Sequence, residues 1–326
     1  MDATNFILDE SLLELDEKPK GKKREQGMVK NLRAVSIHDF LSMEFPVREN
    51  ILAPWLNTQG LAMVHGIRGL GKTFFVIGIA MAVTSGGSFL KWKANKPYGV
   101  LHLDGEMPAV TLQERYCQFI VSNALETTAP LRIITPDLQE FGMPDLSTHE
   151  GQQALEPHLE GISLVIVDNI STMCKGGREN EAESWLPVQE WALKLRTRGI
   201  SVLFVHHAGK AGLQRGTSRR EDVLDTVISL KRPADYRPDE GARFEVHFEK
   251  SRGIYGDDVK PFEAMLITGI DGKQQWVVKD LEESTTEKVV KLLNEGMSQN
   301  EIAEELKISK GTVSKHKQKA INRKLL

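Results

Sequence analysis

Between about residues 31 and 280, short apolar runs rich in β-forming residues alternate with longer amphipathic stretches. This alternation is typical of an α/β fold, in which helices flank a mostly parallel sheet. Near Ile267–Val278, two runs joined by Asp271-Gly272 predict a hairpin. The clearest predicted strands are Leu61–His65, Val100–Leu103, Leu164–Asp168, Val202–His206, Val227–Leu230 and Phe244–Phe248.

The two ends of the chain follow other patterns. Residues 1–30 mix acidic and basic side chains with few aromatic ones, and they predict a disordered arm before an α/β domain of residues 31–280. The polar stretch 281–286 predicts a linker, and residues 284–326 predict a small helical domain. Within that domain we expect helices at Thr285–Glu295, at Gln299–Leu306, and from Lys310 to about Arg323.

Composition narrows the class of protein. The 326 residues carry a net charge of −3, with 40% hydrophobic and 27% charged residues, which favours a soluble protein with a sizeable core. The longest apolar run, Phe74–Val83, has ten residues. A membrane span needs about twice that length, so we expect a buried helix and no membrane partner. The start of the chain lacks a signal pattern, and the isolated Cys117 and Cys174 suit a reducing cytoplasm.

A glycine-rich segment follows the first strong strand. Its sequence, Gly66-Ile67-Arg68-Gly69-Leu70-Gly71-Lys72-Thr73, fits the pattern G-x-x-x-x-G-K-[ST]. Backbone N–H groups of such a loop converge on phosphates, and the next helix adds the positive end of its dipole. We expect Lys72 to reach the β- and γ-phosphates and the Thr73 hydroxyl to bind Mg²⁺. The sequence therefore predicts ATP and Mg²⁺ at a site made by Gly66, Arg68, Gly69, Leu70, Gly71, Lys72, Thr73 and Phe74.

Three further predicted strands end in side chains suited to ATP hydrolysis. Asp168 closes one apolar strand, and a carboxylate there is expected to hold Mg²⁺. A second strand leads into Asp104-Gly105-Glu106. Glu106 is the predicted group that orients the attacking water, with Asp104 as the alternative and a helix-capping role open for either acid. A third strand ends at His207, the predicted γ-phosphate sensor.

In their order and spacing, these motifs resemble the RecA/DnaB superfamily, and most closely the RepA-type hexameric replicative helicases of broad-host-range plasmids. The resemblance covers about residues 36–280. It implies a RecA-like P-loop core that assembles as a homo-oligomer, in that family a hexamer. By the match of motifs, it also implies that Glu106 is the catalytic base and that His207 contacts the γ-phosphate.

A later segment, residues 248–253, resembles the Lys-x-Arg that DnaB-like proteins insert into a neighbouring subunit's site. We expect Arg252 to be this arginine finger and Lys250 to assist it. A guanidinium supplied in trans stabilises charge on the transferring phosphoryl group and ties hydrolysis to assembly. Arg215 and Arg232 are competing candidates.

Two glycine-rich polar loops, Cys174–Ser184 and Ala208–Asp222, follow the strands that end in Asp168 and His207. In RecA-like rings, such loops face the channel and contact single-stranded DNA. The second loop has no aromatic residue for base stacking, so contacts to the DNA backbone would dominate. A solvated loop without a ligand is the alternative. The candidate DNA contacts are Lys210, Arg215, Arg219 and Arg220.

The last twenty residues are strongly basic. Residues 307–326 carry seven Lys or Arg and no acidic residue, which favours DNA as a partner. Helix, tight turn and basic helix describe a helix-turn-helix, and residues 296–320 resemble the LuxR/sigma type. A small protein-docking module is the alternative. The side chains expected to face duplex DNA are Lys310, Thr312, Lys315, His316 and Lys319.

Two hypotheses for function follow. In the first, the protein is a ring-forming, ATP-driven motor on single-stranded DNA, a replicative helicase of a plasmid, phage or mobile element. In the second, it is an ATP-gated DNA-binding regulator or origin-binding factor without unwinding activity, and the helix-turn-helix is the working end. A recombination mediator that forms filaments is a third, weaker interpretation.

Overall fold

The computed structural model describes residues 32–174, 182–208, 221–323 and 325–326. The predicted arm of residues 1–30 lies outside them. The chain divides into two compact units, residues 1–47 and 48–326. In the described part of the first unit, helix α1 (Ile37–Ser42) begins at Ser36, whose hydroxyl accepts the N–H of Asp39.

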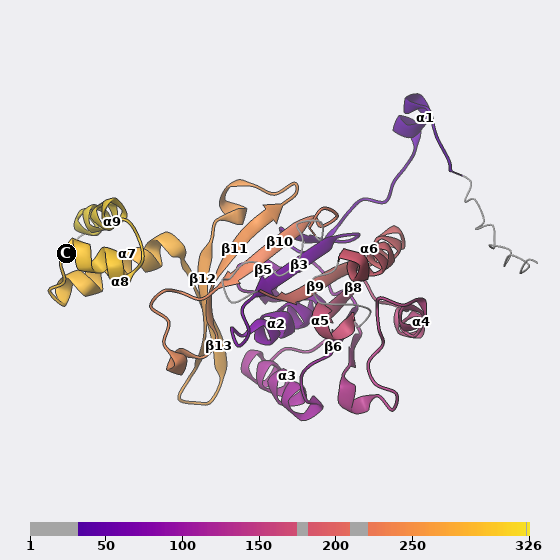
Figure 1. Cartoon of the computed structure of the whole chain (residues 1–326), viewed down its shortest axis with the longest axis horizontal. Coiled ribbons are helices and arrows are strands. Elements are labelled where there is room, and N and C mark those ends of the chain that lie inside the picture. The colour runs from indigo at the N-terminus through magenta and orange to yellow at the C-terminus, as the bar shows by residue number, and fades with distance from the viewer. Residues whose placement is uncertain (1–31, 175–181, 209–220, 324) are drawn as a thin grey trace, which may run out of the picture. The chain divides into compact units, whose positions relative to one another are not determined.

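The second unit contains a nine-stranded sheet (Figure 1). In spatial order the strands are β13 (Gln274–Asp280), β12 (Phe262–Thr268), β11 (Arg243–Ser251), β10 (Thr226–Lys231), β3 (Leu61–Gly66), β9 (Ser201–His207), β8 (Leu164–Asp168), β6 (Val100–Asp104) and β7 (Leu131–Ile134). The six strands from β10 to β7 in this order are parallel to one another. Strands β11, β12 and β13 extend one edge in antiparallel fashion.

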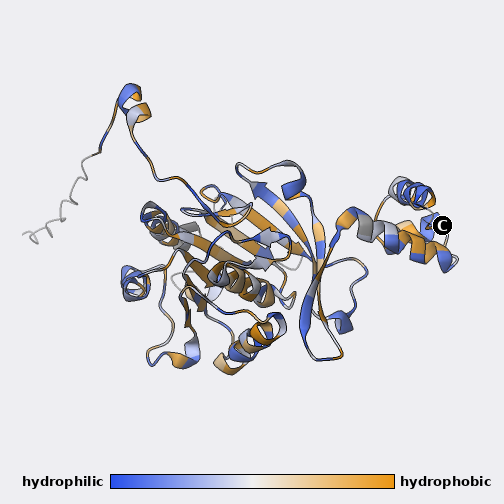
Figure 2. Cartoon of the chain, turned by 180° about the vertical axis from the view of Figure 1, so that it is seen from behind, coloured by the Kyte–Doolittle hydropathy of each residue, from blue (hydrophilic) through white to orange (hydrophobic). Residues whose placement is uncertain are grey.

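Helices cover both faces of this sheet. The remaining elements are β1 (Asn50–Leu52), β2 (Leu56–Asn57), α2 (Lys72–Ser85), β4 (Ser88–Phe89), β5 (Trp92–Lys93), α3 (Ala109–Asn123), α4 (His149–Gln153), α5 (Ile170–Met173) and α6 (Ala182–Thr197). Alternate residues of a strand point to opposite faces. Thus Ala62 and Val64 pack in the core that contains α2, whereas Leu61 and Met63 pack in the core that contains α6. Figure 2 shows the apolar residues concentrated in these central elements.

Helix α2 is buried along most of its length, as its sequence predicts. Its one interior glycine, Gly78, lies so close to Phe89 that a Cβ built on it would be 2.0 Å from the ring. Within the part of the chain that the structure describes, no helix has the length and apolar character required to cross a membrane.

The C-terminal region consists of α7 (Leu281–Asn294), α8 (Gln299–Glu305) and α9 (Lys310–Asn322). Val289, Ile302, Leu306 and Val313 form their core. The capping box at Ser298 is present, but the predicted linker at 281–286 is wrong, because α7 begins directly after β13. The predicted fold class, a RecA-like core with a mostly parallel sheet and a small helix-turn-helix domain, is confirmed.

Gly78→Ala is expected to destabilise the α/β domain. Helix propensity alone favours Ala by about 1 kcal/mol. The clash with Phe89 should outweigh this gain, for a net loss of about 1–3 kcal/mol. Denaturant unfolding followed by tryptophan fluorescence measures the loss, because all five tryptophans precede residue 281. The matched control is Gly311→Ala at an exposed position of helix α9, where a new Cβ would lie 3.7 Å from the Ser309 hydroxyl, and it should leave this transition unchanged.

Candidate functional site

The carboxyl ends of four parallel strands meet at one edge of the sheet. In register, Gly66 of β3 lies beside His207 of β9, and Asp104 of β6 lies beside Asp168 of β8. The predicted phosphate loop leaves β3 here and enters α2, so it has the strand–loop–helix setting that its sequence requires. Gly71 begins the helix with a φ of 101°, a left-handed conformation that favours glycine.

Lys72 is folded back against the loop. Its Nζ donates to the carbonyl oxygens of Gly66 at 2.9 Å and Ile67 at 2.8 Å. Burial lowers the pKa of Lys72 to about 8, although the nearby Asp168 and Glu106 oppose this shift. The ammonium group therefore lies in a poorly solvated position, where phosphate oxygens would be better partners than two neutral carbonyl groups.

Asp168 is buried and only partly satisfied. Its Oδ2 has no hydrogen-bond partner among the described residues, and burial raises the pKa of this carboxyl group to about 7. The neighbouring Asp104 adds to the shift, whereas a hydrogen bond from Thr73 opposes it. A hydroxyl and an unpaired carboxylate oxygen beside a phosphate loop fit Mg²⁺, a cation that prefers oxygen ligands. Ligand atoms of His102, Asp104 and Asp168 also lie within 4.8 Å of one another.

The two candidate bases are placed differently. Asp104 is buried, and its Oδ1 accepts the backbone N–H groups of Glu106 at 2.9 Å and Met107 at 2.8 Å. This carboxylate therefore shapes the turn that follows β6. The side chain of Glu106 is 57% exposed and lines the same pocket as Lys72. Both carboxylates line the pocket, but Glu106 is much the more exposed of the two and is better placed to meet a water molecule above the loop.

Glu106 and His207 are in contact. The Glu106 Oε2 lies 3.0 Å from His207 Nε2 and 2.6 Å from the side-chain amide of Asn169. Burial lowers the pKa of His207, so the ring is neutral near pH 7, while the hydrogen bond from His207 lowers the pKa of Glu106 against the effect of burial. Asn169 was not among the predicted site residues, although a polar residue directly after the strand that ends in Asp168 was a usable signal.

The pocket around these groups has a volume of about 550 Å³, within the range of small-molecule sites. Two of its lining residues were also missed. The Arg115 guanidinium lies 4.3 Å from the ring centroid of Phe74, and Tyr236 approaches from the segment between β10 and β11. No local motif marks either residue, because both reach the pocket through tertiary packing. Among the loop residues predicted to bind ATP, Leu70 is buried and Arg68 is exposed.

Arg252 and Lys250 lie far from this pocket. Strand β11 is antiparallel, so Ser251 pairs with Thr226 at the start of β10, whereas Gly66 pairs with Leu230 near its end. Arg252 therefore lies at the edge of the sheet opposite the phosphate loop, where it forms an ion pair with Asp225 at 3.6 Å. Lys250 Nζ donates to backbone carbonyl groups of Glu221 and Asp222.

The competing arginines are placed otherwise. Arg232 follows β10 at the end nearer the phosphate loop, and its Nη2 donates to the Gly69 carbonyl at 3.2 Å. It therefore lies beside the chain's own phosphate loop. Most of the loop 174–184 lies outside the described residues. So do four predicted DNA contacts of the second loop, Lys210, Arg215, Arg219 and Arg220.

Helix α9 presents some of the predicted DNA contacts and buries another. Lys310 and Lys315 are exposed, and Thr312 pairs with Ser309 at the start of the helix. His316 is buried, with its Nδ1 2.8 Å from the Thr286 hydroxyl of α7, so the prediction that it faces DNA is wrong. It follows Val313 by three positions and therefore shares the core-facing side of the helix. Lys319 forms an ion pair with Glu282 at 3.0 Å.

Comparison with known proteins agrees with this geometry. The family model described as "AAA domain" matches residues 26–212, and the model "Bacterial regulatory proteins, luxR family" matches residues 284–325. The crystal structure of a KaiC-like protein from the hyperthermophilic archaeon Pyrococcus horikoshii OT3 is similar over 68% of this chain and 91% of that one, with a TM-score of 0.47 and 15% identity. No curated protein matches the sequence. Because the first model covers more than half of the chain, the protein belongs to this family of AAA-domain P-loop ATPases, and it carries a luxR-type helix-turn-helix at its C-terminal end.

Proposed function

We propose that the protein is a ring-forming, ATP-driven motor on single-stranded DNA, a replicative helicase of a plasmid, phage or mobile element, similar to the RepA type. The helix-turn-helix would bring it to duplex DNA. The position of Arg252 carries this proposal. An arginine at the edge of the sheet opposite its own phosphate loop is too far away to reach its own nucleotide, so a role in hydrolysis would require the site of a neighbouring subunit.

The polar residues named above then have distinct roles in hydrolysis. Lys72 binds the β- and γ-phosphates, and Thr73 and Asp168 hold Mg²⁺, which supplies charge neutralisation on the phosphate oxygens. Glu106 orients the attacking water and accepts its proton. His207 lies beside Glu106, where its ring can contact the γ-phosphate. Arg115, Phe74 and Tyr236 also line the pocket, and we assign them to the nucleoside.

The first expected result is motor activity. ATP turnover of the purified protein should increase when single-stranded DNA is added, and the protein should displace a strand from a duplex that carries a single-stranded tail. As a control, Glu106→Gln should bind ATP but hydrolyse it about 100- to 10,000-fold more slowly. An ATP-hydrolysing oligomer that never separates strands would contradict the helicase proposal.

The second expected result concerns the shared site. Arg252→Ala and Lys72→Ala should each abolish turnover, because both sides of every interface are defective. Mixed 1:1, they should recover activity at about a quarter of the interfaces if assembly is random, since one intact Lys72 then meets one intact Arg252. Arg232→Ala mixed with Lys72→Ala should give no such recovery, because Arg232 lies by its own loop. Absence of rescue for Arg252→Ala would place the finger elsewhere.

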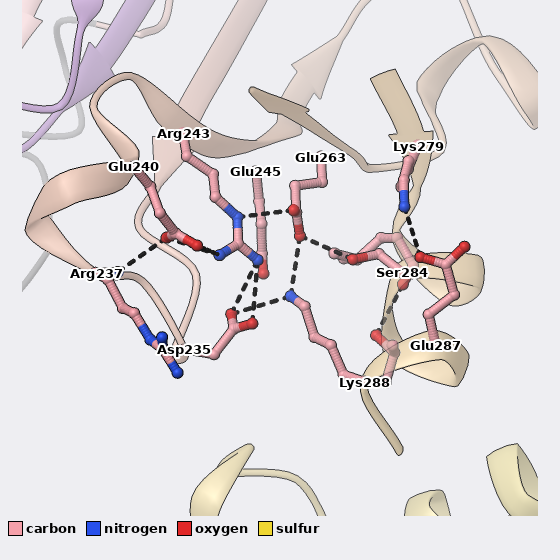
Figure 3. Close-up of polar contacts among 12 residues, drawn as sticks. Asp235, Arg237, Glu240, Arg243, Glu245, Glu263, Lys279, Ser284, Glu287 and Lys288 are labelled. Atoms are coloured by element: carbon pink, nitrogen blue, oxygen red, sulfur yellow. Dashed lines mark hydrogen bonds and ion pairs between the residues drawn. The ribbon is translucent and has the colours of Figure 1, made fainter. Parts of the chain in front are cut away.

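A second candidate function, an ATP-gated DNA-binding regulator, is favoured by a cluster of charged residues between the sheet and α7 (Figure 3). Arg243 of β11 is at its centre, with a side chain 7% exposed. Its guanidinium donates to Glu263 at 2.9 Å, to Glu240 at 2.8 Å and to Asp235 at 3.1 Å. Lys288 of α7 completes the cluster, with Nζ 3.0 Å from Glu263 and 3.1 Å from Asp235.

This cluster adjoins the nucleotide pocket. Ala242, the residue before Arg243, touches the phosphate loop, since a Cβ built on Gly71 would lie 2.8 Å from the Ala242 Cβ. Tyr236, the residue after Asp235, lines the pocket. A movement of the phosphate loop on nucleotide binding would therefore reach the sequence neighbours of both Arg243 and Asp235. These two residues belong to the cluster of ion pairs that holds α7, the first helix of the DNA-binding domain. Such contacts supply a physical connection between the two sites.

Lys288→Met should uncouple nucleotide from duplex binding. The probe is a labelled duplex that binds the wild-type protein, selected from a random library. We expect ATP to change the Kd of the wild-type protein for this duplex by about 5-fold or more. The variant should lose most of this change. Lys291→Met is the matched control, because Lys291 is an exposed lysine of the same helix whose ion pair is with Glu295, the C-cap of α7, and not with the sheet. By reciprocity, the duplex should change ATP affinity by the same factor. Equal Kd values with and without ATP in the wild type would reject the regulator.

A further inference from the structure

We infer that Asn169 is a positioning residue for ATP hydrolysis, whose side-chain amide holds the Glu106 carboxylate beside His207. The inference rests on the proposed role of Glu106 as the catalytic base. It adds a residue that no motif marks and assigns a separate task to each half of one side chain.

The first half of the Asn169 side chain is a helix cap. Asn169 is the N-cap of α5, and its Oδ1 accepts the backbone N–H of Thr172 at 3.3 Å. The residue is 1% exposed, so its side chain has no access to solvent as an alternative partner. Because the oxygen is assigned to the cap, the amide nitrogen must point the other way, towards Glu106.

The second half meets the catalytic pair. Asn169 Nδ2 lies 2.6 Å from Glu106 Oε2 and 3.1 Å from His207 Nε2, and His207 Nε2 lies 3.0 Å from the same Glu106 oxygen. Two nitrogen atoms from two different strand ends thus converge on one carboxylate oxygen. A hydrogen bond to an ionised group is stronger than one between neutral groups, so the amide is a suitable anchor for this acid.

Glu106 needs such an anchor. Its side chain is 57% exposed and lies in the turn after β6, so packing alone does not hold the carboxylate. The turn itself is tied to the strand before Asn169, because Gly105 N–H donates to the Asp168 carbonyl at 2.7 Å. A Cβ on Gly105 would lie 2.4 Å from the Thr172 hydroxyl, so α5 packs directly against this turn. The spacing between the amide and the carboxylate is therefore set by the backbone.

A purely structural cap is the alternative, and two substitutions separate it from positioning. Serine and aspartate cap helices about as well as asparagine, so Asn169→Ser and Asn169→Asp should both retain α5. Neither offers the amide donor, and aspartate also places a second carboxylate against Glu106. We expect Asn169→Ser to keep an unfolding midpoint close to that of the wild type, whereas the buried carboxylate of Asn169→Asp should lower it. Both variants should bind a fluorescent ATP analogue within about 2-fold of wild type. Their single-turnover hydrolysis should fall about 10- to 100-fold, the typical cost of a misplaced reacting group.

A double-mutant cycle with Glu106→Gln is the decisive experiment, run on the full chain with enzyme in excess over labelled ATP. If Asn169 acts through Glu106, Asn169→Ser should slow hydrolysis in the wild-type background and change the residual rate of Glu106→Gln by less than about 2-fold. An equal decrease in both backgrounds, or none in the wild type, would overturn the inference and leave the base assignment intact. Wild-type turnover by Glu106→Gln would instead overturn the assignment of the base, and the inference with it.

Discussion

The chemistry of this protein depends on the register of its parallel strands. Neighbouring strands place Gly66 beside His207 and Asp104 beside Asp168, so a slip of one residue would turn one member of each pair to the other face of the sheet. The apolar residues that precede these ends are buried in two cores on opposite faces, and they set the register. Packing of the core and assembly of the site are therefore one and the same event.

The assembled site holds charges in an unfavourable state. Burial lowers the pKa of Lys72 to about 8 and raises that of Asp168 to about 7. Both shifts record poorly solvated ionisable groups, which cost stability unless a partner is supplied. Phosphate oxygens and a divalent cation are complementary to these two groups. The cost of burying these two groups thus favours the binding of such a ligand.

The sequence predicted what local pattern determines. Strand ends at Asp168 and His207 and the loop up to Thr73 follow from short motifs, and the structure has them at one edge of the sheet. Residues that reach the site through tertiary packing gave no such signal, and Arg115 and Tyr236 are examples.

The errors of the sequence analysis share one cause. His316 is polar and was assigned to DNA, but its hydrogen bond to Thr286 satisfies it inside the domain. The polar stretch 281–286 was taken for a linker, but Ser284 donates to Glu263 at 2.9 Å and joins the helix to the sheet. In both cases a buried partner, invisible in the sequence, replaced water.

Strand β11 brings the two candidate functions together. It starts at Arg243, next to the residue that touches the phosphate loop, and it leads to Arg252 at the opposite edge of the sheet. Through Arg243 it also contacts the carboxylates that hold Lys288 of α7. One hydrogen-bonded strand thus adjoins the chain's own phosphate loop, the site proposed for a neighbour's nucleotide and the DNA-binding domain. A motor would use the Arg252 end of this strand, towards a neighbour's nucleotide, and an ATP-gated regulator would use the Arg243 end, towards the DNA-binding domain.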